Sequence, residues 1–350
     1  MIAVVYGTRP EIIKLSPIIR LAIEQKRDLV TIHTGQHFSH NMNEVFFDNL
    51  ELPRPDYELN VGSKSHAKMV AEALVGIEQI LLKHNPSIVL VQGDTNSALA
   101  GALAAAKLGI RVGHIEAGLR SFDRRMPEEL NRVLVDHMSD LLFAPTHIAY
   151  DYLLSEGIDK DKIKVVGNTI ADALKYGLTK SIDIPIPFSL TPKKYYLATL
   201  HRQENVDDPI ILKQIITNLQ SIISNPSKML ILPLHPRTKQ LLDKHAIDTD
   251  GITLIEPQDY FNFLALLNNA SLVLTDSGGI QEEACILGIP CITLRDNTER
   301  PETVELKSNI LVGSDLAKTI KAINYFESHQ VGWKQPYGES DTAERILSSL

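Results

Sequence analysis

The sequence predicts an α/β protein made of two doubly wound, Rossmann-like domains with a cleft between them. Short, apolar, β-rich segments alternate with longer amphipathic segments along the whole chain, which is typical of βαβ units and parallel sheets. Few of the apolar segments alternate with polar residues, so helices are expected on both faces of each sheet. The length of 350 residues suits two domains of roughly 100 to 200 residues each.

In the first half of the chain, periodicity predicts helices between short strands. Apolar side chains at offsets of zero, four, seven and eleven predict an amphipathic helix over residues 66–84. An Ala-rich segment predicts a closely packed helix at 97–108, and Pro127 followed by two glutamates favours a further helix start. The apolar stripe of the first helix consists of Val70, Leu74, Ile77 and Leu81. The strands are expected at residues 2–6, 29–33, 88–92, 111–115, 141–144 and 163–166.

A change in composition separates the two halves. Three prolines between residues 181 and 193 predict a linker, because a helix or a central strand would not tolerate them. The expected domains are therefore residues 1–180 and 194–333. Residues 334–350 are expected to end in a short helix that could pack on either domain, including back on the N-terminal one. The strands of the second domain are expected at residues 195–200, 229–233, 253–256, 272–275, 291–294 and 310–312.

Composition excludes several classes of protein. The formal charge is −8, from 35 Lys plus Arg against 43 Asp plus Glu, and no long basic run is present, so a nucleic-acid or anionic-membrane binder is not expected. Cys285 and Cys291 are too few for a four-cysteine zinc site and predict no disulfide. No segment approaches the ~20 apolar residues of a membrane span, and no leader is expected before the first strand. A cytoplasmic protein is expected.

Polar residues after the first strand form the first candidate site. The sequence Gly7-Thr8-Arg9-Pro10-Glu11 is followed by Lys14, and it lacks the Gly-x-Gly-x-x-Gly pattern of a dinucleotide site, so no nicotinamide cofactor is expected. Arg9 and Lys14 instead place two cations at a helix start, where they could anchor a phosphate. The alternative is a solvated loop with Lys14 on an outer helix face.

Carboxylates follow two further strands. Asp94 and Glu116 come directly after the strands at 88–92 and 111–115, and neighbouring strands would bring both into one crevice, where they could act as acid and base. Alternatively, Asp94 caps the following helix. Glu128 and Arg132 lie four residues apart, which a simple intrahelical ion pair explains. They could also overhang the crevice and add a third carboxylate.

The run Thr275-Asp276-Ser277-Gly278-Gly279-Ile280-Gln281-Glu282-Glu283 joins a strand to a helix. Small residues at a helix start leave backbone N–H groups open to a pyrophosphate, although a tight turn would also use Gly and Ser. Glu283, one helical turn further on, could accept hydrogen bonds from ribose hydroxyls. His201 and a later arginine segment, Arg295 to Glu302, are further candidates after neighbouring strands.

Other polar patterns do not support a metal site. His33, His37 and His40 lack a carboxylate at a fixed offset. Two Asp-x-Asp patterns, at 159–161 and 248–250, each lie in a polar turn before a strand, so they are interpreted as turn residues. Neither a metal nor any other cofactor is therefore predicted.

Taken together, these motifs resemble the non-hydrolysing UDP-N-acetylglucosamine 2-epimerases over essentially the whole length. The resemblance implies the two-domain architecture of the glycosyltransferase B and glycogen phosphorylase superfamily, interconversion of UDP-N-acetylglucosamine and UDP-N-acetylmannosamine, and a homodimer. The motifs that carry it are Gly7-Thr8-Arg9-Pro10-Glu11, Gly93-Asp94-Thr95, His114-Ile115-Glu116-Ala117-Gly118-Leu119-Arg120, Pro127-Glu128-Glu129-x-Asn131-Arg132, Thr275 to Glu283 and Thr298-Glu299-Arg300-Pro301-Glu302.

The resemblance also implies roles for single residues. It makes Asp94, Glu116 and Glu128 the acid and base carboxylates, supported by Arg132. It places Arg9 and Lys14 in the substrate site. Around the uridine diphosphate it places His201, which also counts among the catalytic residues, together with Gln258, Phe263, Ser277, Gly278, Gly279, Glu283 and Arg300.

One segment departs from the family. Many bacterial members follow a Gln-His pair with a Met-Leu-bearing sequence and bind a second, activating UDP-N-acetylglucosamine there. This chain has Gln36-His37-Phe38-Ser39-His40-Asn41-Met42 instead. Gln36 and His37 are therefore candidates for a regulatory site, but activation by substrate does not carry over with the resemblance.

The reaction explains why these groups are needed. The hydrogen on carbon 2 is not next to a carbonyl, so a carboxylate cannot remove it directly. Expelling UDP from carbon 1 lets loss of this proton give a neutral glycal, and UDP then adds back with protonation from the other face. The alternatives are a hydrolysing epimerase that releases N-acetylmannosamine, a glycosyltransferase, and a regulator that only binds the sugar nucleotide.

Overall fold

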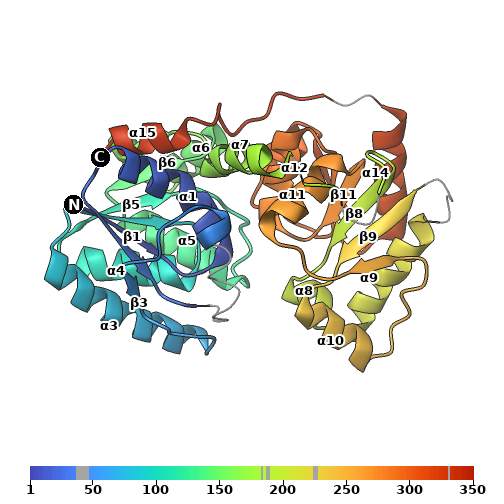
Figure 1. Cartoon of the computed structure of the whole chain (residues 1–350), viewed down its shortest axis with the longest axis horizontal. Coiled ribbons are helices and arrows are strands. Elements are labelled where there is room, and N and C mark those ends of the chain that lie inside the picture. Colours follow the sequence, from blue (N-terminus) through green and yellow to red (C-terminus); the bar gives the residue numbers. More distant parts are fainter. Residues whose placement is uncertain (37–46, 183, 187–189, 224–227, 330–331) are drawn as a thin grey trace. The chain divides into compact units, whose positions relative to one another are not determined.

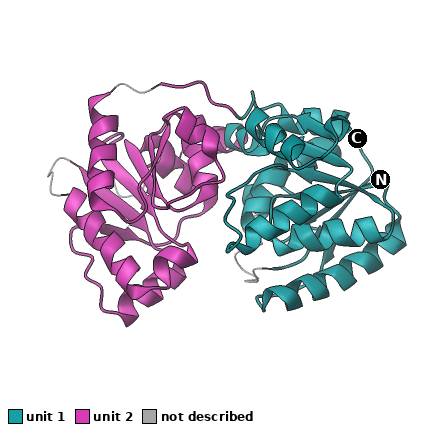
Figure 2. Cartoon of the chain, turned by 180° about the vertical axis from the view of Figure 1, so that it is seen from behind, with its two compact units in different colours: residues 1–175, 337–350 teal, residues 176–336 magenta. Residues whose placement is uncertain are grey.

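The computed structural model describes residues 1–36, 47–182, 184–186, 190–223, 228–329 and 332–350. The chain divides into two compact units, which Figure 2 shows in different colours. Unit 1 comprises residues 1–175 and 337–350, and unit 2 comprises residues 176–336. The expected linker lies partly outside the described residues. Among the helices that are described, none is long and apolar enough to cross a membrane.

Unit 1 contains a parallel sheet (Figure 1). Its described strands follow the order β3-β2-β1-β4-β5-β6-β7. The chain moves outward from β1 in one direction and from β4 in the other, as the predicted doubly wound fold requires. The prediction missed β3, which has only two residues and pairs with the end of β2. The strands are β1 (Ile2–Tyr6), β2 (Leu29–His33), β3 (Tyr57–Glu58), β4 (Ile88–Gln92), β5 (Arg111–Ile115), β6 (Leu141–Ala144) and β7 (Ile163–Val165).

Helices cover the sheet of unit 1, so β1 and β4 are buried along their full length. Thr95 caps α4 by accepting a hydrogen bond from the Ala98 N–H (3.0 Å), and Asn85 ends α3 in the left-handed conformation that suits asparagine. The last helix, α15, packs on α1, the first. The helices are α1 (Arg9–Glu24), α3 (His66–His84), α4 (Asn96–Lys107), α5 (Pro127–Met138), α6 (His147–Ser155) and α15 (Thr342–Ser348). A further helix, α7 (Thr169–Ser181), begins in unit 1 and ends in unit 2.

The buried face of α3 differs from the predicted stripe. Ile77 and Leu81 are buried as expected, but Val70 and Leu74 are only partly buried. The latter two line a largely apolar groove of about 440 Å³ between α3, α4 and α5. The core face is completed by Met69, Ala73 and Ile80. The stripe was assigned by spacing alone, which does not show which of two adjacent apolar faces meets the sheet.

Unit 2 repeats the doubly wound plan with the strand order β10-β9-β8-β11-β12-β13. All six strands match the predicted segments to within one residue at each end. They are β8 (Tyr195–Thr199), β9 (Met229–Pro233), β10 (Thr253–Ile255), β11 (Leu272–Thr275), β12 (Cys291–Thr293) and β13 (Asn309–Leu311). The helices are α8 (Gln203–Val206), α9 (Pro209–Ile222), α10 (Pro236–Lys244), α11 (Tyr260–Asn269), α12 (Gly278–Leu287), α13 (Pro301–Glu305) and α14 (Leu316–Ser328).

Each unit therefore has a topological switch point, where the direction of strand addition reverses. It lies between β1 and β4 in unit 1 and between β8 and β11 in unit 2. Ligands of open parallel sheets bind outside the carboxyl ends of the strands at such points. The residues that follow these strands are therefore the first place to look for a site.

Candidate active site

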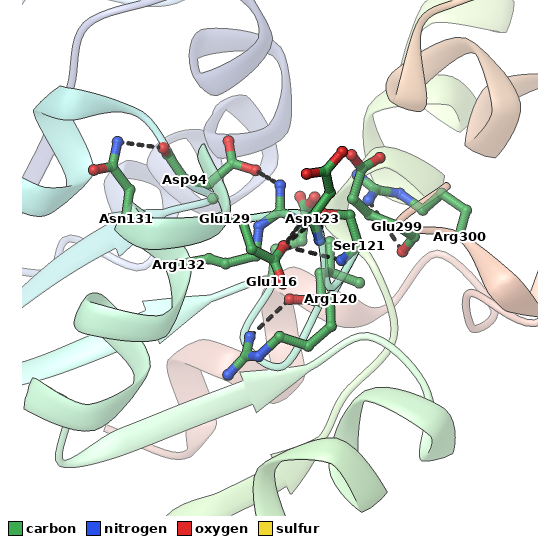
Figure 3. Close-up of polar contacts among 12 residues, drawn as sticks. Asp94, Glu116, Arg120, Ser121, Asp123, Glu129, Asn131, Arg132, Glu299 and Arg300 are labelled. Carbon is green, nitrogen blue, oxygen red and sulfur yellow. Dashed lines mark hydrogen bonds and ion pairs between the residues drawn. The ribbon is translucent and has the colours of Figure 1, made fainter. Parts of the chain in front are cut away.

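In unit 1, the loops after β1, β4 and β5 lie at one edge of the sheet. β4 pairs with both β1 and β5, which confirms that the strands before Asp94 and Glu116 are neighbours. The polar residues that follow these strands are consequently gathered at the switch point. Figure 3 shows Asp94 and Glu116 with the polar residues around them.

Glu116 is buried and held by two donors on one carboxylate oxygen. Lys14 Nζ lies 2.5 Å from its Oε2, and Gln92 Nε2 donates to the same atom at 2.6 Å. The side chain of Lys14 is only 7% exposed, so the interpretation of Lys14 as a solvated residue is wrong. Glu116 also has a φ of +70°, an unfavourable conformation for a residue with a Cβ, and such strain clusters at functional sites.

Asp94 faces solvent more than Glu116, with its side chain 32% exposed, and it forms an ion pair with Arg132. Asn131 Nδ2 donates to the Asp94 carbonyl at 2.9 Å, as Figure 3 shows. The alternative role of Asp94 as a helix cap is wrong, because Thr95 caps α4. A side chain of α5 thus holds the Asp94 carboxylate, which does not cap the helix that follows it.

The expected ion pair between Glu128 and Arg132 does not form. Arg132 turns inward toward Asp94, and its Nη1 bonds Glu129 Oε2 at 2.9 Å instead. Glu129 is buried and also accepts hydrogen bonds from the Ser121 N–H (2.9 Å) and hydroxyl (2.8 Å), so it fixes the loop before α5. Glu128 is half-buried and makes no hydrogen bond or ion pair with the residues that the structure describes. Its carboxylate therefore remains available.

Glu11 joins two of the loops at the switch point. Its carboxylate is 1% exposed and accepts hydrogen bonds from the Gly7 N–H (3.0 Å), the Thr8 hydroxyl (2.8 Å) and the Thr95 hydroxyl (2.8 Å). Burial raises the pKa of Glu11 to about 7 against the effect of these donors. Arg9, two residues earlier, is half-buried, and burial lowers its pKa.

The candidate regulatory residues are only partly described. Gln36 Oε1 accepts hydrogen bonds from the Ser97 hydroxyl (3.0 Å) and N–H (3.3 Å) in the first turn of α4. His37 and His40 lie outside the described residues. His33 is buried beside Tyr6, and burial lowers the pKa of its imidazole to about 4. Within the described ranges, no three His, Cys, Asp or Glu side chains are grouped as metal ligands.

In unit 2, α12 begins directly after the buried strand β11, with Ser277 as its N-cap. Neither Gly278 nor Gly279 has a positive φ. A Cβ on Gly278 would come no closer than 3.5 Å to another residue, and one on Gly279 no closer than 3.9 Å. The turn itself therefore does not require glycine at either position, which counts against the tight-turn interpretation. The helix start offers its N–H groups to an anion.

Asp276, just before this helix start, meets the loop after β8. Its fully buried carboxylate lies 2.9 Å from His201 Nδ1 and accepts hydrogen bonds from the backbone N–H groups of His201 (3.0 Å) and Arg202 (2.9 Å). Burial alone would raise the pKa of Asp276, but these donors and the charge of His201 lower it below its ordinary value. The His201 ring itself is 40% exposed.

The remaining candidates of unit 2 surround α12. Arg300 is buried, pairs with Glu282, and its Cζ would lie 3.9 Å from a Cβ on Gly278. Glu283 is buried, and its charge adds to the effect of burial in raising the pKa of Tyr260. Gln258 and Phe263 are partly buried, just before and within α11. In the Asp-x-Asp segments, Asp159 caps the short 3-10 helix η1 (Lys160–Lys162), and Asp159 and Asp248 each accept a hydrogen bond from the backbone N–H two residues later.

Several residues of these clusters escaped the sequence analysis. Gln92, Glu129, Asn131 and Asp276 all hold a predicted site residue in place. Three of the four lie in motifs that were singled out, so their position next to a predicted residue was the available signal. Gln92 is the last residue of a buried strand, where a polar side chain is itself unusual.

These features define an α/β protein of the glycosyltransferase B type with polar clusters at both switch points. The sequence model for the UDP-N-acetylglucosamine 2-epimerase family matches residues 20–350. The chain belongs to this family.

Similar proteins agree with this assignment. A UDP-N-acetylglucosamine 2-epimerase of Methanocaldococcus jannaschii is 52% identical, with alignment over 100% of this chain and 98% of the relative. A crystal structure of the M. jannaschii enzyme with UDP-GlcNAc and UDP superimposes with a TM-score of 0.94, at 51% identity, over 99% of this chain and 98% of the other. A UDP-2,3-diacetamido-2,3-dideoxy-D-glucuronate 2-epimerase of Pseudomonas aeruginosa is 44% identical over 89% of this chain and 88% of the relative.

Proposed function

We propose that this protein interconverts UDP-N-acetylglucosamine and UDP-N-acetylmannosamine without hydrolysis. The observation that carries the proposal is the pair of carboxylates at the switch point of unit 1. Glu116 is buried against Lys14, whereas Asp94 is partly exposed against Arg132. Two carboxylates in such different environments suit a reaction that removes a proton from one face of a sugar and returns one to the other. Glu128 is the third candidate acid or base.

The nucleotide is proposed to bind in unit 2. The start of α12 supplies the Gly278 and Gly279 N–H groups for the diphosphate. Ser277 is proposed to contribute its hydroxyl, because its N–H donates to the Thr275 hydroxyl (3.0 Å). Glu283, one turn later, is proposed to accept hydrogen bonds from ribose, and His201 is proposed to stabilise the departing diphosphate. Gln258, Phe263 and Arg300 complete the proposed nucleotide site, and Arg9 and Lys14 are proposed to bind the substrate from unit 1.

The proposed reaction is elimination followed by addition. The bond between carbon 1 and the diphosphate oxygen breaks, with its electron pair remaining on UDP. A carboxylate takes the proton from carbon 2, and a glycal results. UDP then adds back while a second carboxylic acid protonates carbon 2 from the opposite face. These steps need only groups that stabilise the charge on the diphosphate and groups that transfer protons.

We further propose a cytoplasmic homodimer that supplies an activated sugar for polysaccharide or glycan synthesis. The second copy is supported by two exposed leucines of α5. Leu130 lines the apolar groove of unit 1, and Leu134 lies one helical turn later. Large contiguous apolar surfaces mark sites of protein–protein interaction.

Incubation with UDP-N-acetylglucosamine alone in heavy water tests the function and its chemistry together. We expect UDP-N-acetylmannosamine with deuterium at carbon 2, detected by NMR, because the carboxylates exchange their protons with solvent. Free N-acetylmannosamine would instead indicate the hydrolysing alternative. An unchanged substrate would favour a regulator or a glycosyltransferase that lacks its acceptor. Epimerisation with the original hydrogen retained would refute elimination as the mechanism.

A further inference from the structure

Asp276 links the two loops that frame the switch point of unit 2. β8 and β11 are paired strands, and the hydroxyls of Thr199 and Thr275 at their ends lie 2.6 Å apart. Directly beyond them, the Asp276 carboxylate receives donors from the β8 loop: two backbone N–H groups, the Asn205 amide (3.3 Å) and the His201 ring. A buried carboxylate is tolerated only when several donors replace its water, and Asp276 has them.

The contact with His201 also determines how that ring is arranged. An ionised carboxylate only accepts hydrogen bonds, so the Nδ1 atom 2.9 Å from Asp276 Oδ1 carries a hydrogen. The ring is partly exposed, and Nε2 is then the nitrogen available to a ligand. In the protonated ring Nε2 is also a donor. Backbone anchoring alone would have needed no contact with the ring.

Other charged groups near the pair do not take the place of Asp276 at the His201 ring. The His235 ring lies 6.2 Å from the His201 ring, centroid to centroid, and His235 Nδ1 accepts the Arg237 N–H at 3.3 Å. The charges on the Asp276 side include Arg295, which is paired with Glu299, and Glu204, which lies 3.4 Å from Arg295. Among these groups, Asp276 is the one whose carboxylate directly contacts the His201 imidazole.

We infer that Asp276 is a positioning residue that orients His201, so that Nε2–H of the protonated ring faces the departing diphosphate. This inference rests on the proposed function. As the bond to carbon 1 breaks, the electron pair stays on the diphosphate oxygen, and Nε2–H donates a hydrogen bond to the charge that develops there. Asp276 touches neither substrate nor product and acts only through His201.

Steady-state kinetics of Asp276→Asn, compared with Asn205→Ala, tests the inference. Asp276→Asn should lower kcat about 10²-fold or more, with KM for UDP-N-acetylglucosamine changed less than about threefold, since the ring loses its orientation and its counter-charge. Asn205→Ala loosens the same loop but leaves the ring contact in place, so its loss of kcat should be much smaller. Equal losses of kcat in both variants would overturn the inference.

A measurement on the wild-type protein keeps the inference testable if Asp276→Asn does not fold. In protein labelled with ¹⁵N at histidine, with the His201 signals assigned by comparison with His201→Gln, NMR should show Nδ1 protonated in the neutral ring. A neutral ring protonated at Nε2 instead would overturn the inference. This result does not depend on turnover, so it stays separate from failure of the proposed function, which would appear as no epimerisation by the wild type.

Discussion

Replacing Gly278 or Gly279 with alanine should weaken binding of UDP without weakening the fold. The methyl group on Gly278 would lie 3.5 Å from Glu299 Oε2 and 3.9 Å from the Arg300 guanidinium, and on Gly279 it would lie 3.9 Å from Ser277 Oγ. These are ordinary contacts, and neither residue has a positive φ. The free energy of unfolding should therefore stay the same or rise by about 0.4–1 kcal/mol, because alanine restricts the unfolded chain.

The expected loss of affinity follows from the role of the helix start. A phosphate oxygen must come within hydrogen-bond distance of a backbone N–H, and a Cβ beside that N–H holds it away. Losing one hydrogen bond to a charged group removes about 1.5–3 kcal/mol, which corresponds to about a 10- to 100-fold weaker Kd for UDP. Isothermal titration calorimetry measures this Kd, and thermal unfolding of the same samples measures stability.

Gly118→Ala is the matched control for a glycine that the fold does require. Gly118 has a φ of +83°, and its Cβ would lie 2.4 Å from the Ala149 carbonyl oxygen. The left-handed conformation alone costs about 1–2 kcal/mol for alanine, so this variant should unfold at a clearly lower temperature. If Gly278→Ala and Gly279→Ala bind UDP as tightly as the wild type, the proposed diphosphate site is wrong. If they lose as much stability as Gly118→Ala, the glycines serve the turn.

Two further predictions concern unit 1. Asp94→Asn, Glu116→Gln and Glu128→Gln, made singly, should each lower turnover about 10²- to 10⁴-fold while UDP binding measured by calorimetry is kept, and near-normal turnover in all three would refute the carboxylate site. The second concerns Glu11, whose pKa is raised from 4.5 to about 7, so that its contribution to stability is complete below pH 4.5 and is lost as the pH rises through 7. From pH 4.5 to 8, Glu11→Gln should therefore gain roughly 2–3 kcal/mol in free energy of unfolding relative to the wild type, measured by chemical denaturation. If the difference in free energy of unfolding between the two proteins does not depend on pH, the pKa of Glu11 is not raised.

The sequence was sufficient to predict the fold because the strands of both units are short, buried and bounded by polar turns. Nearly every one was placed to within a residue. The exception, β3, consists of Tyr57 and Glu58, a pair too short to show a pattern and ordered only by pairing with β2. The orientation of α3 could not be predicted either, because two adjacent faces of this helix are apolar and tertiary packing decides between them.

At the candidate site, the sequence predicted which residues gather but not how they pair. Neighbouring strands explain why Asp94 and Glu116 come together. The partner of Arg132 could not be inferred from helix spacing, because an aspartate 38 residues earlier in the chain draws the guanidinium away from Glu128. For the same reason the part played by Glu129, one residue further on, is visible only once the loop before α5 has folded.

The way unit 1 is assembled from two separate stretches of chain affects how the protein folds during synthesis. Residues 337–350 belong to unit 1, and Thr342, Ala343, Ile346 and Leu347 of α15 are buried in it, yet they are translated after the whole of unit 2. Unit 2 is continuous and can close as soon as it has left the ribosome. The first unit to be translated is thus the last to be completed, and until then the surface of α1 that α15 covers stays open to chaperones and proteases.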